Sequence, residues 1–585
     1  MDRTGIFIAF LLLGAVVLAP VGAMVWESVT VDAVETRDGT RYLGFVTDSD
    51  ETGVTIRVAG ETNTRHLPAA DIVSRGRVPS LENYRSVLAH TGERSMLLAT
   101  VVLAGVSTLL AILIGLPLGL LLAATNIPMR RTLEMVSVLP LVLPPILLAI
   151  AAYHDLLAVE PEFLRAAVVF GLSLFPLVSL LTARAVRAAG AEALDAARIQ
   201  TGPWNALLKV GLRPALPGAA SGALLVFVFV VSDFAVPDFL GVTTAQNTIT
   251  VYANAVFNYW SKDGNAVAAP AAGMPVTLLA LAAFATVLVV EWKRDAATVT
   301  TRFREIEPMP LGRARWPLFL AVVLLLLLTV GGPMVRHLQT TGGAHYGSPV
   351  SQGGVAGTQP SPDEIRAKPL SVWAGLKKGV QYTGIGDNVV NSLVLASGGA
   401  LLALLLAIVL TGAGQGRPVL DRFLLVCSFL PVAVPPMVLA VGWVRLYGPW
   451  THADYFPVVL MGARLLPFAT LAVRAARRQV AGELLEAASL SGLGPAARTL
   501  RITLPLIAPG AALGFLLAFL FGLREVDAVI FTKSGAQTLP VRLYGMIHTA
   551  LDVQVAGLAA LWTAGNALLL VILRIMLGSR FRLLP

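Results

Sequence analysis

Charged residues and cysteine are both scarce in this chain. Charged side chains make up 14% of the 585 residues and hydrophobic ones 56%, whereas soluble domains carry about 25% charged residues. The mean hydropathy is +0.74. The single cysteine, Cys427, stands inside an apolar run and has no partner for a disulfide bond, so cysteine usage says nothing about the redox compartment. The composition excludes a soluble globular protein and indicates an integral membrane protein.

Motifs for catalysis and metal binding are missing as well. The Walker A pattern, whose backbone N–H groups and lysine cradle phosphate, does not occur, and the glycine-rich segment 412–418 lacks both the lysine and the hydroxyl. The seven histidines show no metal-ligand spacing, and no Gly-x-Ser-x-Gly nucleophile motif has plausible partners. We therefore expect a chain that is not an enzyme, has no metal site and no cofactor, and leaves any ATP to partner subunits.

Twelve apolar runs are long enough to cross the hydrocarbon of a bilayer, at about 20 residues each. They predict an all-α polytopic membrane protein. The first run could be a cleaved signal peptide, but its length favours a retained helix. The runs lie near 5–26, 96–124, 134–153, 166–184, 217–236, 270–291, 317–332, 390–412, 423–446, 456–474, 507–523 and 555–574.

Lysine and arginine collect in alternate loops, and this pattern orients the spans. With the amino terminus inside, every cytoplasmic loop receives basic residues. The net charge of +9 then follows from topology, and the lack of a basic patch with interleaved aromatic residues argues against nucleic-acid binding. We expect a multi-pass protein of the bacterial cytoplasmic (inner) membrane with both termini in the cytoplasm.

Five prolines recur after one interval of 291 residues, which divides the spans into two sets of six. Since 36 of 585 residues are proline, roughly half a match is expected by chance. The five matches indicate a duplication, so function is expected to lie between two equivalent halves. Pro140, Pro144, Pro145, Pro176 and Pro214 return as Pro431, Pro435, Pro436, Pro467 and Pro505.

Two segments outside the membrane differ between the halves. Residues 27–80 alternate apolar and polar side chains around the turns Asp38-Gly39 and Thr52-Gly53, which predicts a small extracytoplasmic β domain. Residues 333–388 are rich in Gly, Ser and Pro and lack apolar periodicity, which predicts a mobile loop. Each could be a spacer or a recognition element.

A pair of cytoplasmic loops, 186–214 and 477–505, is the most informative feature. Each reads as a short helix opened by acids, a Gly/Pro break, and a second short helix stopped by proline. Such loops are too long for simple connections and too short of apolar surface to form a core, so we expect them to dock on a partner. A hairpin lying on lipid headgroups is the alternative. Two equivalent loops favour a two-fold partner.

At these loops the chain resembles the permease subunits of binding-protein-dependent ATP-binding-cassette importers. Their signature is Glu-Ala-Ala, a following Gly, and Ile-x-Leu-Pro. The first loop departs from it, with an aspartate as its acid, the Gly displaced by one position, and Gly211 and Arg213 where Ile and Leu are expected. The second loop matches through Glu486, Ala487, Ala488, Gly492, Ile502, Leu504 and Pro505, and the first through Asp195, Ala196, Ala197, Gly202 and Pro214.

The resemblance implies partners and a mechanism. Two ATPase subunits would dock on the loops, unequally because the first loop departs from the signature, and an extracytoplasmic solute-binding protein would deliver the solute. Fusion of two cores is most similar to the ferric-iron and thiamine branch, and segments 233–241, 524–532 and 538–544 resemble ferric-type permeases. The 27–80 domain is not a usual part of that branch. Ferric iron, thiamine, phosphate or phosphonate, and polyamine all remain open as solutes.

Acids and prolines at equivalent positions of the halves are candidates for the transport pathway. Asp233 and Glu525 stand near the outer ends of the fifth and eleventh spans, where an acid faces water or the bundle interior. An acid already solvated beyond the helix end is an equal alternative. The proline pairs kink their spans because proline cannot donate a hydrogen bond, either as a hinge or as a static bend. These residues are Pro144, Pro145, Pro435 and Pro436.

The sequence thus predicts two related six-helix halves that move a solute by alternating access. An ion-coupled secondary transporter also has internal repeats, but buried charges for ion coupling are scarce and the two loops would be unexplained. The expected segments are a first span 1–26, the β domain 27–80, a first core 81–295, a cytoplasmic linker 296–316, a seventh span 317–332, the loop 333–388 and a second core 389–585.

Overall fold

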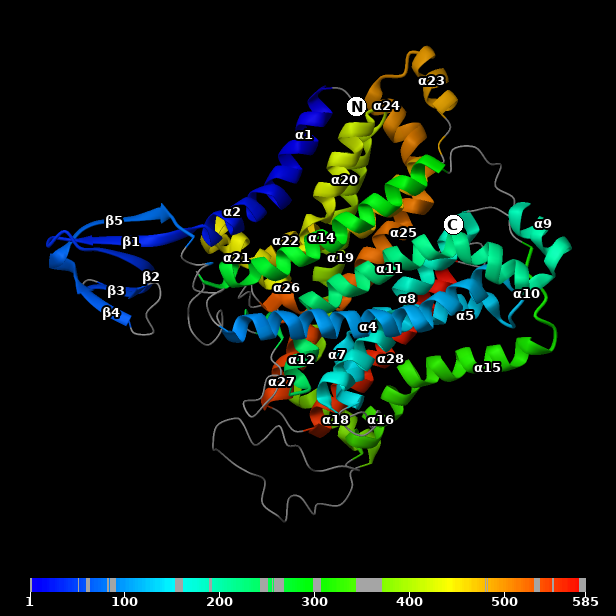
Figure 1. Cartoon of the computed structure of the whole chain (residues 1–585), viewed down its shortest axis with the longest axis horizontal. Helices are drawn as coiled ribbons and strands as arrows, with labels where there is room; N and C mark the ends of the chain where they lie inside the picture. The colour runs from blue at the N-terminus through cyan, green and yellow to red at the C-terminus, as the bar shows by residue number, and fades with distance from the viewer. Residues whose placement is uncertain are drawn as a thin grey trace. The chain divides into compact units, whose positions relative to one another are not determined.

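A computed structural model gives the fold of the chain. Figure 1 shows its helices and strands coloured along the chain. Contacts divide the chain into two compact units, and each unit takes segments from both halves of the sequence. Unit 1 comprises Met1–Thr100, Ala245–Leu281 and Leu393–Ala536, and unit 2 comprises Val101–Thr244, Ala282–Ser392 and Gln537–Pro585. The structure describes residues 3–50, 52–58, 64–81, 84, 91–152, 161–188, 192–241, 251–254, 256, 268–297, 307–342, 371–383, 385–478, 480, 482–530, 537–549 and 552–577.

Unit 1 joins the amino-terminal span to most of the second core. The span runs through α1 (Arg3–Leu13), a π-turn and α2 (Ala19–Ser28), and α2 packs along α21 (Pro436–Tyr447). Gly442 allows this approach, since a Cβ there would lie 2.2 Å from the carbonyl oxygen of Pro20. The other helices are most of α19 (Ile385–Gly414), α20 (Pro418–Ala433), α22 (Phe456–Arg478), α23 (Gly482–Leu490), α24 (Pro495–Arg498), α25 (Leu504–Leu523) and α26 (Asp527–Ile530).

Unit 2 joins most of the first core to the seventh span and the carboxy-terminal helices. Its closest helix pair is α8 (Glu162–Ala188) with α11 (Leu212–Ser232), where a Cβ on Gly218 would come within 2.4 Å of the carbonyl oxygen of Leu181. The helix α28 (Asp552–Leu577) packs against α16 (Gly332–Thr341). The other helices are most of α4 (Thr91–Ala124), α5 (Arg130–Val136), α6 (Leu139–Val142), α7 (Pro145–Ala151), α9 (Glu192–Thr201), α10 (Pro203–Ala206), α12 (Ala235–Phe239), part of α14 (Ala268–Ala297), α15 (Arg315–Leu326), α18 (Val372–Thr383) and α27 (Leu539–Thr549).

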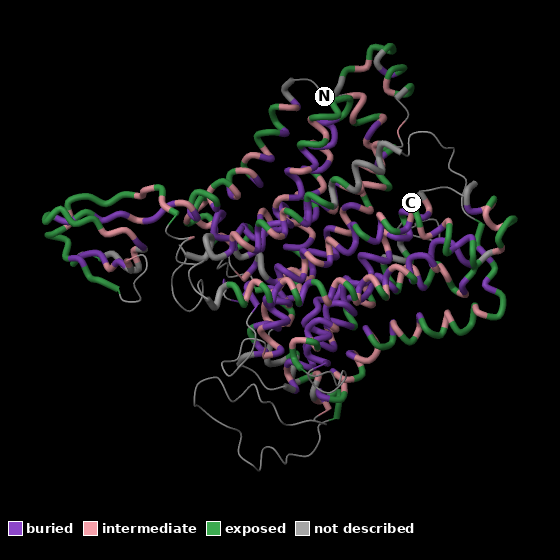
Figure 2. Tube along the Cα trace, viewed as in Figure 1, coloured by how far each residue is buried: buried purple, intermediate pink, exposed green. Residues whose placement is uncertain are grey.

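The described residues contain nine helices that are long and apolar enough to cross a membrane, or up to eleven if each of two bent helix pairs is one span. A further apolar helix, Gly273–Thr286, is shorter. Exposed stretches occur along several of these helices (Figure 2). The exposed residues include large aliphatic ones, such as Leu11 on α1, Leu113 on α4 and Leu324 on α15. Such surfaces are costly in water and suit hydrocarbon. The membrane character is therefore confirmed, whereas the count of twelve spans stays a prediction.

The paired prolines produce sharp breaks rather than gentle kinks. Leu143 and Val434 each leave the helix in an extended conformation, with ψ of 134° and 130°. A residue before proline is pushed out of the α region, and two successive prolines remove two N–H donors. The helix axes therefore turn by 83° at Pro144 and by 104° at Pro435.

A five-stranded antiparallel sheet lies between α2 and α4 in the sequence, and belongs to unit 1. Its strand order is β4-β3-β2-β1-β5, and Gly39 makes the first turn at φ +79°. Val34, Val54, Ile56 and Leu67 form its small core. The strands are β1 (Thr30–Thr36), β2 (Arg41–Ser49), β3 (Gly53–Val58), β4 (Thr64–Pro68) and β5 (Ile72–Pro79).

Parts of the segment 333–388 are helical where a mobile loop was expected. The helix that holds the seventh span continues to Thr341, and α18 and the start of α19 follow within the same segment. Packing of α16 and α18 on α28 explains these helices, because such tertiary contacts cannot be read from local composition. Residues 343–370 and 384 lie outside the described part of the chain.

Candidate functional site

Both loops singled out in the sequence form helix–turn–helix hairpins. The first hairpin (residues 192–211) consists of α9, a break at Gly202 and α10, and the second hairpin (residues 482–503) of α23, a break at Gly492 and α24. Each belongs to a different compact unit. The glycines at the two breaks adopt the same left-handed conformation, since both have φ of +79°. A Cβ at either position would meet no atom within 4 Å, so backbone conformation rather than space requires glycine there.

The displaced glycine of the first hairpin therefore keeps its function. Its N–H donates to the carbonyl oxygen of Arg198 at 3.1 Å, and in the second hairpin the N–H of Ser491 donates to that of Ala487 at 3.0 Å. Local hydrogen bonds close both helix ends before the chain turns. The turn accommodates the one-residue displacement of this glycine that the sequence shows.

The second helix of each hairpin does not stop at the proline, contrary to expectation. It continues through a π-turn, Leu207–Gly211 in the first hairpin and Thr499–Thr503 in the second, into the span helix α11 or α25. Pro214 and Pro505 follow the π-turns directly within the continuous helix, so their missing N–H groups fall where the regular α-helical hydrogen bonding is already interrupted. Each hairpin is thus continuous with a membrane span.

Exposed aliphatic side chains stand at equivalent places on the two hairpins, and the signature pattern did not reveal them. Ile199 is 89% exposed and Leu490, 291 positions later, is 90% exposed. Leu208 and Leu500, inside the two π-turns, are also exposed. Large apolar side chains are thus held exposed at matching positions of the two hairpins. The interval of the proline repeat, applied to these residues, would have found the first pair.

The signature acids differ between the hairpins. The Asp195 carboxylate is half-buried and accepts a hydrogen bond from Arg198 of its own helix at 2.9 Å. Glu486 is exposed, and within the described residues its carboxylate forms no ion pair. The second hairpin therefore offers an open carboxylate and the first does not.

The remaining signature residues take supporting positions. Ala488 is buried beneath its helix, whereas Ala196 and Ala487 are exposed. Ala197, Ile502, Leu504 and Pro214 are half-buried, and Pro505 is exposed.

The acids after the fifth core spans are held by local contacts. Asp233 follows the last residue of α11, and its Oδ1 accepts the N–H of Val236, in the first turn of the short helix α12, at 3.1 Å. Glu525 follows α25 closely and pairs with Arg464 of α22 at 3.2 Å. Both acids are thus placed at helix ends, and each also stabilises its surroundings.

A further polar pair near Asp233 was not expected from the sequence. The hydroxyl of Tyr544 on α27 donates to Oδ2 of Asp238 on α12 at 2.8 Å, and the Tyr544 ring packs edge-on against Phe234. These residues come from opposite halves of the sequence but lie in one compact unit. Within the described residues, no group of three His, Cys, Asp or Glu side chains could hold a metal ion.

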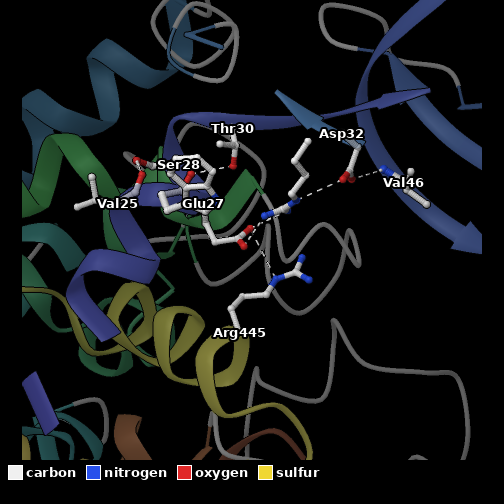
Figure 3. A network of polar contacts seen from close by, with 9 residues as sticks. Val25, Glu27, Ser28, Thr30, Asp32, Val46 and Arg445 are labelled. Atoms are coloured by element: carbon white, nitrogen blue, oxygen red, sulfur yellow. Dashed lines mark hydrogen bonds and ion pairs between the residues drawn. The ribbon is translucent and has the colours of Figure 1, made fainter. Parts of the chain in front are cut away.

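A buried carboxylate joins the sheet to the second core. The Glu27 side chain, 6% exposed, receives two hydrogen bonds from Arg77 of β5. It also faces Arg445 of α21 at 3.6 Å (Figure 3). Asp32 accepts from Arg77 and from the Val46 N–H. The hydrogen bonds to Glu27 hold the pKa of the Arg77 guanidinium above its ordinary value, which keeps this side chain positively charged. We call Glu27, Asp32, Arg77 and Arg445 the ionic joint.

A polytopic helical chain with two equivalent hairpins, each continuous with a span, has the features of the membrane subunit of a transport system. The family model described as binding-protein-dependent transport system inner membrane component matches residues 115–296 and 399–579, more than half of the chain. The chain belongs to this family, and the family domain occurs twice in it. Permeases of this family work with an ATPase and a substrate-binding protein.

Individual relatives match over limited segments. The molybdenum transport system permease protein ModB of Mycobacterium tuberculosis is 30% identical over 164 residues, 26% of this chain and 62% of that protein. The Fe(3+)-transport system permease protein FbpB 2 of Haemophilus influenzae is 29% identical over 173 residues, 28% of this chain and 34% of that protein. The putrescine transport system permease protein PotI of Escherichia coli is 24% identical over 213 residues, 33% of this chain and 75% of that protein. The matched segment thus covers less than two thirds of ModB and of FbpB 2.

Proposed function

We propose that this chain supplies two transmembrane cores of an ATP-driven importer, with two ATPase subunits docked on its two hairpins. One observation carries the proposal: both hairpins combine a left-handed glycine, an exposed aliphatic residue at the end of the first helix and a continuous passage into a span. Hairpins resting on lipid headgroups would not require this repeated geometry.

The proposed mechanism is alternating access driven through the hairpins. When the ATPases close on ATP, they displace the hairpins, and the π-turns pass that motion into α11 and α25 because no break separates hairpin from span. A partner shifts such an equilibrium only by its different affinity for the two states. Solute arrives from an extracytoplasmic binding protein and leaves on the side of the ATPases.

Ferric iron is the solute we propose to test first. The two fused cores and the segments 233–241 and 524–532 resemble ferric-type permeases, and one relative is named for Fe(3+) transport. Other relatives are named for molybdenum, glycerol-3-phosphate and putrescine transport. Thiamine and phosphonate complete the panel, and all can be compared in one uptake assay.

The experiment is co-purification followed by reconstitution. The chain would be isolated with its native partners, the co-purifying ATPase and binding protein identified, and solute uptake measured in proteoliposomes with and without ATP. ATP-dependent uptake of one solute supports the proposal. Uptake driven by an ion gradient without any ATPase would show an ion-coupled secondary transporter instead.

A further inference from the structure

A short segment between the two halves of the sequence contacts both the backbone that follows α4 and the first hairpin. Met309 forms an isolated parallel β-bridge with Thr125, which follows α4. The N–H of Met309 donates to the carbonyl oxygen of Ala124 at 2.8 Å, and its own carbonyl oxygen accepts from the N–H of Asn126 at 3.0 Å. The Asn126 side-chain oxygen in turn accepts from the N–H of Leu311 at 2.9 Å. We call residues 307–311 the strap.

The side chain of Met309 joins a cluster that several elements share. It is 2% exposed and belongs to an apolar cluster contributed by the end of α4, by α8, by the first hairpin and by the start of α11. The strap therefore packs the hairpin against the core as well as pairing with the backbone after α4. The other buried members of the cluster are Leu120, Ala123, Ala124, Ala183, Val186, Leu194, Ala206, Leu207 and Ala215.

Hydrogen bonds from Arg198 link the first helix of the hairpin to the same strap. One end of its guanidinium donates to Asp195 at 2.9 Å and another N–H donates to the carbonyl oxygen of Glu307. A planar guanidinium can make both contacts at once, whereas the single ammonium of lysine could not hold the same pair in this geometry. The position 291 residues after Arg198 is Ser489, which has no guanidinium to make this pair of contacts.

The strap also compensates for the weak signature of the first hairpin. Gly211 stands where the signature has isoleucine and is buried, and a Cβ there would come within 3.3 Å of Leu207 and 3.5 Å of Leu194. Position 211 thus contributes no side chain to the cluster, and Met309 supplies a large apolar one from outside the hairpin. Among the described residues, no backbone bridge of this kind reaches the second hairpin.

We infer that the strap is a positioning element of the first hairpin, with Met309 and Arg198 as its positioning residues. It fixes the hairpin to α4 and α8 by contacts that come from outside the hairpin. The role of the hairpin as an ATPase site rests on the proposed function, but the positioning itself does not. Loss of the strap should loosen the first hairpin and leave the second unchanged.

Hydrogen–deuterium exchange on the full chain in nanodiscs tests this inference without any partner. In Met309→Ala and Arg198→Ala, amides of residues 194–211 should exchange at least about tenfold faster than in the wild type, because a buried anchor is lost. Residues 482–503 should keep their rates. Met309→Leu should restore slow exchange, and Arg213→Ala, which removes an exposed arginine of the same region, should have no effect. Unchanged rates at 194–211, or equal acceleration in both hairpins, would overturn the inference.

A second readout separates this inference from the proposed function. Photo-cross-linkers placed at Ile199 and Leu490 would be activated in complexes with the co-purified ATPase. In Met309→Ala the cross-link yield should fall several-fold at position 199 and stay constant at 490. If the wild type cross-links at neither position, the proposed function fails while the exchange result still decides the strap. Equal yields at 199 in the wild type and both strap variants would count against the strap.

Discussion

At the scale of single residues, the acids of the two signatures differ in length and in the contacts that they make. Asp195 is shorter than glutamate and is already paired with Arg198, whereas Glu486 is exposed and open to a partner. An acid satisfied within its own helix contributes little to a contact with another protein. The sequence predicted unequal sites from missing signature residues, and the structure offers a second reason for the same inequality.

Charge reversal should therefore affect the second hairpin more than the first. Removing one partner of a buried, charge-assisted contact costs about 2–5 kcal/mol, whereas a solvated rim charge costs under about 1 kcal/mol. We expect Glu486→Lys to abolish most ATPase association and solute uptake, and Asp195→Lys to reduce them less. Both would be measured at matched expression. Wild-type uptake in both variants would mean that the acids only cap surface helices.

The ionic joint gives a second prediction at this scale. Arg77→Ala leaves the buried Glu27 carboxylate with only the longer contact to Arg445, and losing hydrogen bonds to a charged group costs about 1.5–3 kcal/mol. We expect faster proteolysis of the sheet and a lower melting temperature. The double variant Glu27→Gln/Arg77→Gln should recover part of the loss, because no unpaired charge stays buried. Arg37→Ala, at an exposed turn, is the control, and equal stability of Arg77→Ala and this control would contradict the prediction.

At the scale of elements, periodicity and the length of the apolar runs predicted where the helices lie. They did not predict which helices pack against one another. Apolar runs located the spans because hydrocarbon demands about 20 such residues. The prolines at 144 and 435 predicted where the helices bend. The bend angles, however, depend on the preceding residues, which adopt an extended conformation. Contacts such as Arg198 with Glu307, or Asp238 with Tyr544, join residues more than a hundred positions apart and leave no local pattern.

The left-handed glycines permit a test of the hairpin geometry. An L-residue forced into this conformation costs roughly 1–2 kcal/mol, which corresponds to a factor of about 5–30 in an equilibrium. We expect Gly492→Ala to weaken ATPase association by about that factor. Gly494→Ala provides the control, since its surroundings are equally open and its φ is not positive. Indistinguishable affinities of the two variants would remove the turn from the docking argument.

At the scale of the whole molecule, each compact unit mixes segments from both sequence halves. Residues 245–281 belong with the second core, and residues 537–585 belong with the first. The sequence repeat alone suggested two contiguous cores, because a repeat reports ancestry rather than which helices pack together. Neither half of the sequence contains all the segments of one unit.

The orientation in the membrane remains a prediction that labelling can decide. The lysine and arginine pattern places both hairpins and both termini in the cytoplasm. In a Cys427→Ser background, cysteines at Gln200 and Ser491 should resist an impermeant reagent added to intact cells and react once the cells are opened. Labelling of either cysteine from outside would reverse the topology.

The chain on its own should hydrolyse no ATP. It lacks a phosphate-cradling loop, and its family is that of the membrane component rather than the motor. Phosphate release by the homogeneous chain should stay at the level of empty nanodiscs and rise only when the partner ATPase is added. Turnover by the isolated chain would contradict this expectation.

The packing of α2 on α21 also sets a timetable for biosynthesis. Pro20 is synthesised long before Gly442, against which it packs. At roughly 5–20 residues per second, the ribosome needs on the order of 20–80 s to reach Gly442. During that interval the amino-terminal span and the sheet that follows it have no contact with their final neighbour. The sheet carries its own core of Val34, Val54, Ile56 and Leu67, and can therefore fold early. The ionic joint can close fully only when Arg445 emerges, which makes it a late step of assembly.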